Sequence, residues 1–159
     1  MNKFGSIFAP MAFCMTLASF PVLASSPAAT SVTHDMIQEI NQARKQKGRK
    51  SLKPKASLMR AAQKQADELA SRGYGTILKR GGHIGKNGST NSDRIRRAGY
   101  KACTSLENLA WGQKSAEEAV TAWMVSAGHR KNLLNRKIRD IGVGFAPPKT
   151  WVMVGARPC

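Results

Sequence analysis

The chain has 159 residues, and its 26 Lys and Arg against nine Asp and Glu give a net charge of +17 at pH 7. This length fits one domain with a real core, and no repeat, linker or low-complexity tract divides it, which excludes a repeat array or several domains. The charge predicts a positive field that attracts anionic polymers or surfaces.

The start of the chain has the pattern of a secretory signal peptide. Lys3 gives a positive start, residues 8–20 are mostly apolar, and Ala24 ends the small-residue pattern that signal peptidase cleaves, so cleavage is expected before Ser25. The apolar stretch is too short and too interrupted by proline for a convincing membrane span; an uncleaved anchor is the alternative. We therefore expect a signal peptide (1–24), a short lead-in (25–32) and one secreted or periplasmic domain (33–159) without a transmembrane segment.

Two amphipathic helices are expected next. Thr33 is the expected N-cap of the first, in which apolar residues recur at helical spacing until Gly48. Pro54 is expected to open the second helix, and Gly73 to end it. The following segment, residues 75–89, is glycine-rich and predicted to be irregular.

Capping patterns predict two more helices. Thr90 and Asp93 resemble a capping box for a short helix that ends at Gly99. Ser115 and Glu118 form a clearer capping box. The buried face of this fourth helix is expected to consist of Ala116, Ala119, Val120, Trp123 and Met124.

The expected strands lie late in the chain. Two apolar runs, residues 141–145 and 151–154, are separated by a proline-containing turn and predict a hairpin-like pair, and residues 106–110 are a candidate further strand. Because the strands are few and clustered and helices flank them, the pattern favours an α+β layered domain over a regular βαβ succession.

Export leaves two cysteines, Cys103 and Cys159, because Cys14 lies in the signal peptide. An even pair in an oxidising compartment predicts one disulfide, with two free thiols as the alternative. In the chain-entropy model such a crosslink stabilises the fold by about 4 kcal/mol.

The region around Glu107 carries the strongest sign of a functional site. Glu107 is the only carboxylate between Asp93 and Glu117, in a chain dominated by basic residues, and two tryptophans and His129 lie close by in the sequence. An isolated acid near a histidine in such a chain suggests a site.

Five motifs, in this order, resemble a known family. They are His83; Ser92-Asp93-Arg94-Ile95 with Gly99-Tyr100; Glu107-Asn108-Leu109-Ala110; Ala119-Val120 with Trp123-Met124 and Ser126 to Asn132; and Ile141-Gly142-Val143-Gly144. Together they resemble the bacterial branch of the CAP superfamily (SCP domain), which includes cysteine-rich secretory proteins, antigen 5 and plant pathogenesis-related 1 proteins. The resemblance covers roughly residues 34–154. It implies a three-layer α-β-α sandwich, an extracytoplasmic location, and a cleft lined by two histidines and two acids.

The resemblance assigns three cleft residues. His83 resembles the family's first cleft histidine, Glu107 the acid of its Gly-Glu-Asn motif, and His129 its second cleft histidine. Leu106 stands where the family has the glycine of that motif, a change that affects the local turn and keeps the acid.

The fourth, acidic member of the family's cleft has no counterpart here. Ser126 and Ala127 occupy its neighbourhood, so a triad is expected, with Asn108 and Ser126 as candidate neighbours. Asp93 is expected to cap its helix and is the nearest spare acid.

The three cleft residues also predict a metal site. Two imidazoles and a carboxylate match the ligand count of a catalytic Zn²⁺ or a similar divalent ion, which keeps three protein ligands and one water. Because the three residues lie far apart in the sequence, only folding can bring them together.

Each cleft residue has a structural alternative. His83 could be an exposed loop histidine, and Glu107 could balance Arg130 or Lys131 or accept hydrogen bonds from the backbone. His129 could interact with the negative end of the fourth helix's dipole.

Three functions follow from these patterns. We favour a ligand-binding or interaction module, expected to be monomeric, over an enzyme. One alternative is a metal-dependent hydrolase or peptidase that uses the same cleft. A serine nucleophile would need Ser126 or Ser105 activated by His129 with Glu107 behind it, and nothing in the sequence shows that geometry. The other is a cationic binder of anionic envelope polymers, lipid headgroups or nucleic acid, although no motif for specific nucleic-acid recognition is present. Its candidate basic clusters are residues 44–50, 94–101 and 130–139.

Overall fold

The computed structural model describes residues 27–73 and 81–159, so the predicted signal peptide lies outside the described residues. The elements in chain order are α1 (Pro27–Gln46), β1 (Lys53–Pro54), α2 (Ala56–Arg72), α4 (Asn91–Arg97), β2 (Ala102–Trp111), α5 (Ala116–Val125), α6 (Ala127–Leu133), β3 (Asp140–Ala146) and β4 (Thr150–Pro158). Within these residues no helix has the length and apolar character needed to span a membrane.

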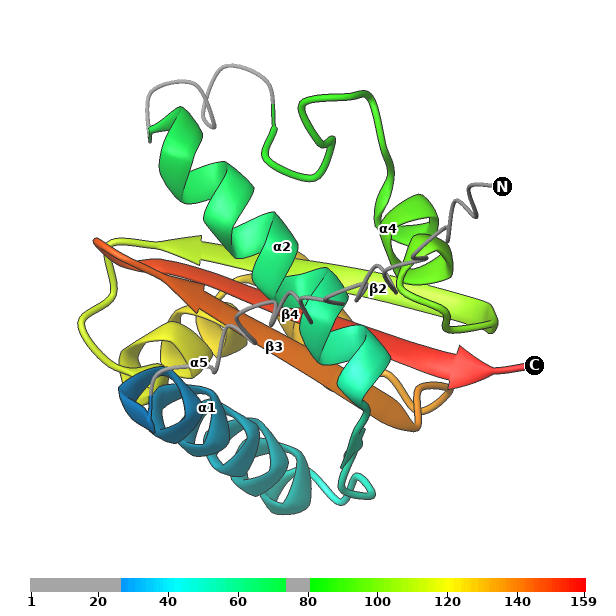
Figure 1. Ribbon diagram of the computed structural model, residues 1–159. Coiled ribbons are helices and arrows are strands. Elements are labelled where there is room, and N and C mark those ends of the chain that lie inside the picture. Colours follow the sequence, from blue (N-terminus) through cyan, green and yellow to red (C-terminus); the bar gives the residue numbers. More distant parts are fainter. Residues whose placement is uncertain (1–26, 74–80) are drawn as a thin grey trace, which may run out of the picture.

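One four-stranded sheet, in the order β1-β3-β4-β2, forms the centre of the molecule. The predicted hairpin is confirmed as the antiparallel pair β3–β4, in which Phe145 lies opposite Trp151. β2 pairs antiparallel with β4 and lies at an edge of the sheet, and the short β1 pairs parallel with β3 at the other edge (Figure 1).

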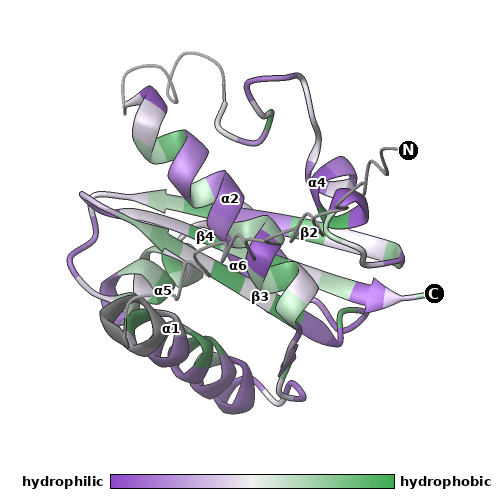
Figure 2. Ribbon diagram, in the orientation of Figure 1, coloured by the Kyte–Doolittle hydropathy of each residue, from purple (hydrophilic) through white to green (hydrophobic). Residues whose placement is uncertain are grey.

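Alternating strand residues bury the two faces of this sheet. Ile141, Val143 and Met153 pack in one cluster with residues of α1, α5 and α6. Val152 and Val154 pack in a second cluster with α2 and with Ile95 of α4. Figure 1 shows α2 across one face of the sheet and α1 and α5 on the other, which confirms the α-β-α sandwich. In Figure 2, α1 and α2 each carry both hydrophobic and hydrophilic residues, as helices with one buried face do.

Two glycines let α2 lie directly on β3. A Cβ atom added to Gly142 would lie 2.1 Å from the carbonyl carbon of Leu58, and one added to Gly144 would lie 2.5 Å from that of Ala62. The helix backbone therefore contacts the strand backbone, and this contact fixes the height of α2 above the sheet.

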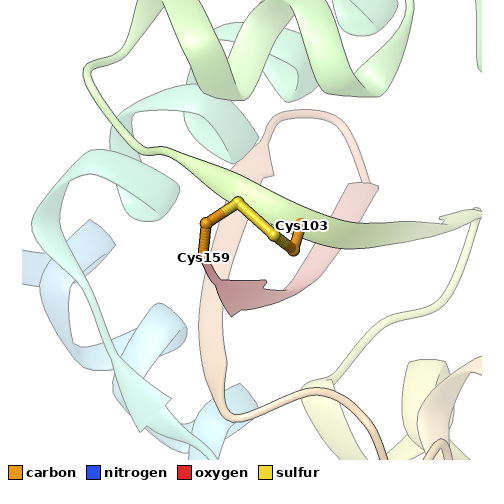
Figure 3. Close-up of a disulfide and its surroundings, with 2 residues drawn as sticks. All are labelled: Cys103 and Cys159. Atoms are coloured by element: carbon orange, nitrogen blue, oxygen red, sulfur yellow. A yellow bond between two sulfur atoms is a disulfide. The ribbon is translucent and has the colours of Figure 1, made fainter.

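The predicted disulfide between Cys103 and Cys159 is confirmed. The two Cα atoms are 4.8 Å apart, and the bond joins the start of β2 to the last residue of the chain (Figure 3). It fastens β2 to β4 at the end where their pairing is irregular, between Ala102 and Thr104.

Two predicted helix starts are wrong. α1 begins at Pro27, so Thr33 lies inside the helix and residues 27–32 are helical. Pro54 belongs to β1, and α2 begins at Ala56. The backbone N–H groups of Lys53 and Lys55 donate to the carbonyl oxygens of Arg139, just before β3, and of Ile141, within it. Proline, which has no N–H, fits between them in an edge strand.

The two predicted caps differ in completeness. Thr90 and Asp93 form a full capping box at α4. The Ser115 hydroxyl accepts a hydrogen bond from the Glu118 N–H at 3.1 Å, but the Glu118 carboxylate accepts from the N–H of Lys114 at 2.7 Å. The Glu118 carboxylate thus binds the N–H of the residue before the N-cap, where a full capping box would bind the N–H of Ser115 itself.

The fourth predicted helix is α5, and a further helix, which was not predicted, follows it directly. α5 ends at Val125, Ser126 adopts an extended conformation, and α6 begins at Ala127. Trp123 is in the core, as predicted, with 1% of its surface exposed, and its indole N–H donates to the carbonyl of Leu109 at 2.9 Å.

Candidate functional site

The edge strand β2 places its side chains on two sides of the sheet. Glu107 lies opposite Val154 and Leu109 opposite Val152, and these valines belong to the cluster under α2 and α4. Because side chains alternate along a strand, Glu107 faces α4 while Asn108 faces α6. Glu107 is buried, with 6% of its surface exposed.

A buried ion pair holds the Glu107 carboxylate. Arg94 Nη2 lies 2.6 Å from Glu107 Oε2, and the two side chains are 7% and 3% exposed. His83 Nδ1 lies 2.9 Å from Glu107 Oε1. Both carboxylate oxygens therefore have a partner, which offsets the cost of removing the charge from water.

Arg94 was missed by the sequence analysis, which placed it in a basic surface cluster. Its guanidinium also donates to the backbone carbonyls of Ser89 at 2.8 Å and His83 at 3.2 Å. Arg94 thus fastens the loop that carries His83 to β2. The prediction that Glu107 balances a basic residue is right in kind, but the partner is neither Arg130 nor Lys131. The available signal was the position of Arg94 beside the apolar Ile95 on a short helix.

His83 is both exposed and tethered. Its side chain is 53% exposed, while Nδ1 contacts the buried carboxylate. With the proton on Nδ1, this nitrogen donates to Glu107, and Nε2 is left as a hydrogen-bond acceptor. In this tautomer the half-exposed loop histidine keeps one ring nitrogen as an acceptor for a ligand.

An amide network holds α6 against the other side of β2. The Asn108 side chain, fully buried, donates to the backbone carbonyl of His129 at 2.9 Å. Asn132 donates to Asn108 Oδ1 at 3.0 Å and to the backbone carbonyl of Glu107 at 3.2 Å. Asn108 is thus a positioning residue, and Asn132 is a second residue that sequence reasoning missed, although it ends the motif after His129.

His129 lies in the first turn of α6, partly buried. Burial lowers its pKa, and so does the nearby His83. The two histidines therefore share one electrostatic environment. The helix-dipole alternative for His129 is wrong, because α5 ends at Val125 and His129 belongs to the beginning of the next helix.

The other candidate residues lie apart from this cluster. Ser126 precedes α6 and its hydroxyl makes no capping hydrogen bond, and Ser105 Oγ lies 3.1 Å from Ser92 Oγ. Asp93 caps α4 and pairs with Arg96 at 2.7 Å, and its pKa is lowered, mainly by the hydrogen bond from the Thr90 hydroxyl. Across residues 27–73 and 81–159, no relay links a serine through His129 to Glu107.

The expected metal site needs a different arrangement. Both oxygens of Glu107 are engaged by Arg94 and His83, and the part of the chain that the structure describes contains no group of three His, Cys, Asp or Glu side chains placed to hold a metal ion. As they stand, His83, Glu107 and His129 do not fit a three-ligand site. Metal binding by them stays a prediction.

We call His83, Arg94, Glu107 and His129 the His–Glu site. It combines a rigid buried ion pair with an exposed imidazole and a second histidine whose neutral form is favoured. Such a group can both donate and accept hydrogen bonds. Arg94 also lines a cavity of about 230 Å³, together with residues of α2, of α4 and of the loop before α4.

The sequence profile of the cysteine-rich secretory protein family, CAP, matches residues 37–154. "Uncharacterized protein YkwD" of Bacillus subtilis (strain 168) is 34% identical over 122 residues, which are 76% of this chain and 45% of that protein. "Uncharacterized membrane protein YlbC" of the same organism is 34% identical over 62 residues, 39% of this chain and 18% of that protein. The chain thus spans less than half the length of these curated relatives.

Solved structures show the same fold. An extracellular protein containing an SCP domain from Bacillus anthracis superposes with a TM-score of 0.74 at 22% identity, over 87% of this chain and 45% of that chain. An outer surface protein from Borrelia burgdorferi superposes with a TM-score of 0.64 at 21% identity, over 86% of this chain and 97% of that chain.

Proposed function

Because the chain belongs to the cysteine-rich secretory protein family, CAP, we propose that it is an exported interaction module that binds a polar ligand at the His–Glu site. One observation carries the proposal: the buried Arg94–Glu107 pair holds His83, which is 53% exposed, by one ring nitrogen. A charge pair that served only the fold would not need an exposed imidazole. The ring is oriented before any ligand arrives, which lowers the cost of binding.

Three observations support export. The start of the chain has the pattern of a signal peptide, and the Cys103–Cys159 disulfide suits an oxidising compartment. Two proteins of similar fold are described as an extracellular protein and an outer surface protein. Mass spectrometry of the protein from its native host tests this proposal: a mature chain that begins at Ser25 supports it, and an intact chain in the cytoplasm contradicts it.

Ligand binding is tested on a panel of purified envelope components, including wall polymers, glycolipids and phospholipid vesicles, at about 0.15 M salt. The wild type is compared with H83A/H129A and with R96Q/R97Q/R130Q/K131Q, which removes exposed charge and keeps both histidines. We expect at least one component to bind the wild type and the charge variant but not the histidine variant. The reverse pattern would favour the cationic binder.

The metal-dependent hydrolase stays a prediction that no contact in the described residues favours over the interaction module. It is tested by metal analysis of the purified protein, with a variant that changes His83, Glu107 and His129 to Ala as the control. One bound metal ion per chain that this variant lacks would promote the hydrolase. A parent chain without stoichiometric metal would count against it.

A further inference from the structure

A second, strongly basic concave surface lies at the end of α1. We call it the basic pocket, and it has a volume of about 310 Å³. Its lining consists of Arg44, Gly48, Arg49, Lys50, Arg136 and Arg139. None of these residues belongs to the His–Glu site. Two basic clusters that are far apart in the sequence, residues 44–50 and 130–139, therefore meet around one cavity.

Arg44 lines this pocket, and it has no carboxylate partner among the described residues. It is 1% exposed. Nε donates to the carbonyl of Lys50 at 3.0 Å, and Nη1 donates to those of Leu133 at 2.6 Å and Asn135 at 3.2 Å. In the described parts of the chain, ion pairs form at Arg72, His83, Arg94 and Arg96, and none forms in this pocket. A buried cation that meets only neutral oxygens keeps a desolvation cost.

The neighbouring arginines are also held by the main chain. Arg49 Nε donates to the carbonyl of Leu134 at 3.1 Å, and Arg139 Nη1 donates to those of Arg136 at 2.6 Å and Ile138 at 2.9 Å. Burial, together with the charges of Arg49 and Arg139, lowers the pKa of Arg44 to about 10. The like charges are thus fixed close together and repel one another.

A purely structural role explains only part of this cluster. The carbonyl contacts of Arg44, Arg49 and Arg139 fasten the chain after α1 to the chain after α6. Lys50 and Arg136 are exposed, and their side chains make no hydrogen bond or ion pair with the described residues. They add positive charge where it is already in excess, which is unfavourable for the fold alone.

We propose that the basic pocket binds a multiply charged phosphate group, a phosphomonoester or a diphosphate. Guanidinium groups whose orientation is already fixed match phosphate oxygens with paired N–H donors. The lining of the pocket contains five cations and no acid. These cations can neutralise a ligand with a charge of about −2 or more, which phosphomonoesters carry near neutral pH. The volume of about 310 Å³ lies at the lower end of the range for small-molecule sites.

The test is calorimetric titration with inorganic diphosphate at about 0.15 M salt. K50Q/R136Q removes two pocket charges whose side chains make no hydrogen bond or ion pair with the described residues. The matched control, K114Q/K149Q, removes two charges beyond the opposite end of β3, about 20 Å away by strand length. We expect one saturable site in the wild type and in the control, and at least about tenfold weaker binding to K50Q/R136Q. No saturable binding, or equal weakening in both variants, would overturn the proposal.

Vesicles distinguish the sources of the phosphate. Phosphatidylcholine vesicles with phosphatidic acid present a monoester, and vesicles with phosphatidylglycerol present a diester. If the protein floats with phosphatidic acid vesicles and diphosphate inhibits this binding, the pocket binds a lipid headgroup. If the protein binds diphosphate and neither kind of vesicle, the pocket binds a soluble ligand. Vesicle binding that is equal for both lipids and is unaffected by K50Q/R136Q would contradict a phosphate pocket.

Discussion

At the scale of single residues, the site depends on a charge pair that sequence reasoning could only half identify. The lone Glu107 pointed to a site because acids are scarce in this chain. Its partner Arg94 was one of many basic residues, and only the packing of α4 against β2 buries that one and leaves Arg96 exposed. Side-chain pairing across two elements depends on their docking, which local sequence patterns do not encode.

Arg94→Met should destabilise the fold strongly. It leaves the Glu107 carboxylate buried, with only His83 as a side-chain partner, and breaking such a pair costs about 3–5 kcal/mol. The measurement is the free energy of unfolding from denaturant titration. Arg96→Met is the matched control, because Arg96 is exposed and its pair with Asp93 is a surface pair, which contributes little to stability. Equal losses in the two variants would refute the assigned burial.

His129 should make stability depend on pH. Its pKa is lowered in the folded protein, mainly by burial, so the unfolded state binds more protons once the pH falls below about 6.5. Above that pH, His129 does not lower the free energy of unfolding. As the pH falls from there through the lowered folded pKa, the free energy of unfolding declines. His129→Gln should flatten this decline in metal-free buffer. The control is His34→Gln, whose side chain is exposed on α1, and an equal effect would contradict the role of His129.

At the scale of elements, several short-range patterns were read correctly from sequence, although the helix starts expected at Thr33 and Pro54 were not. The hairpin of β3 and β4, the capping box of α4 and the buried face of α5 depend on neighbouring residues. β1 was missed because two residues carry no periodicity and pair only with the distant β3. α6 was missed because a single extended residue, Ser126, separates it from α5.

Gly142→Ala should separate α2 from β3. The new methyl group would overlap the backbone of Leu58, and overpacking of this kind costs about 1–3 kcal/mol, or more where backbone must move. Gly128→Ala is the control, because a Cβ there meets nothing within 4 Å and alanine favours the helix by up to about 1 kcal/mol. Thermal unfolding of both variants gives the comparison, and a Gly142→Ala protein as stable as the wild type would contradict the close contact.

At the scale of the whole molecule, the resemblance of the motifs to the family implied the α-β-α architecture, and the late strands by themselves favoured an α+β layered domain. Sequence patterns could not predict that residues 44–50 and residues 136–139 line the same pocket, because this depends on how the ends of α1 and α6 pack. The net charge of +17 predicted attraction to anions in general. The fold concentrates part of that charge in one pocket.

Removing the disulfide should lower the free energy of unfolding of the whole domain. Cys103 and Cys159 are 56 residues apart, and a crosslink over such a loop contributes about 4 kcal/mol by restricting the unfolded chain. The free energy of unfolding of C103S/C159S should therefore be lower by that amount, and its denaturant midpoint should fall. The wild type treated with reductant should approach the double variant, and an unchanged midpoint in both would contradict the disulfide's role.

The measurement that tests the proposed binding role most directly is the dissociation constant of an envelope component, for the wild type and for His83→Ala, at about 0.05 M and 0.5 M salt. A ligand held by the His–Glu site should bind about tenfold or more weakly to the variant at both salt concentrations, with little change between them, because short-range contacts carry the affinity. An affinity that falls steeply in high salt and is the same for the wild type and His83→Ala would contradict a ligand site at His83.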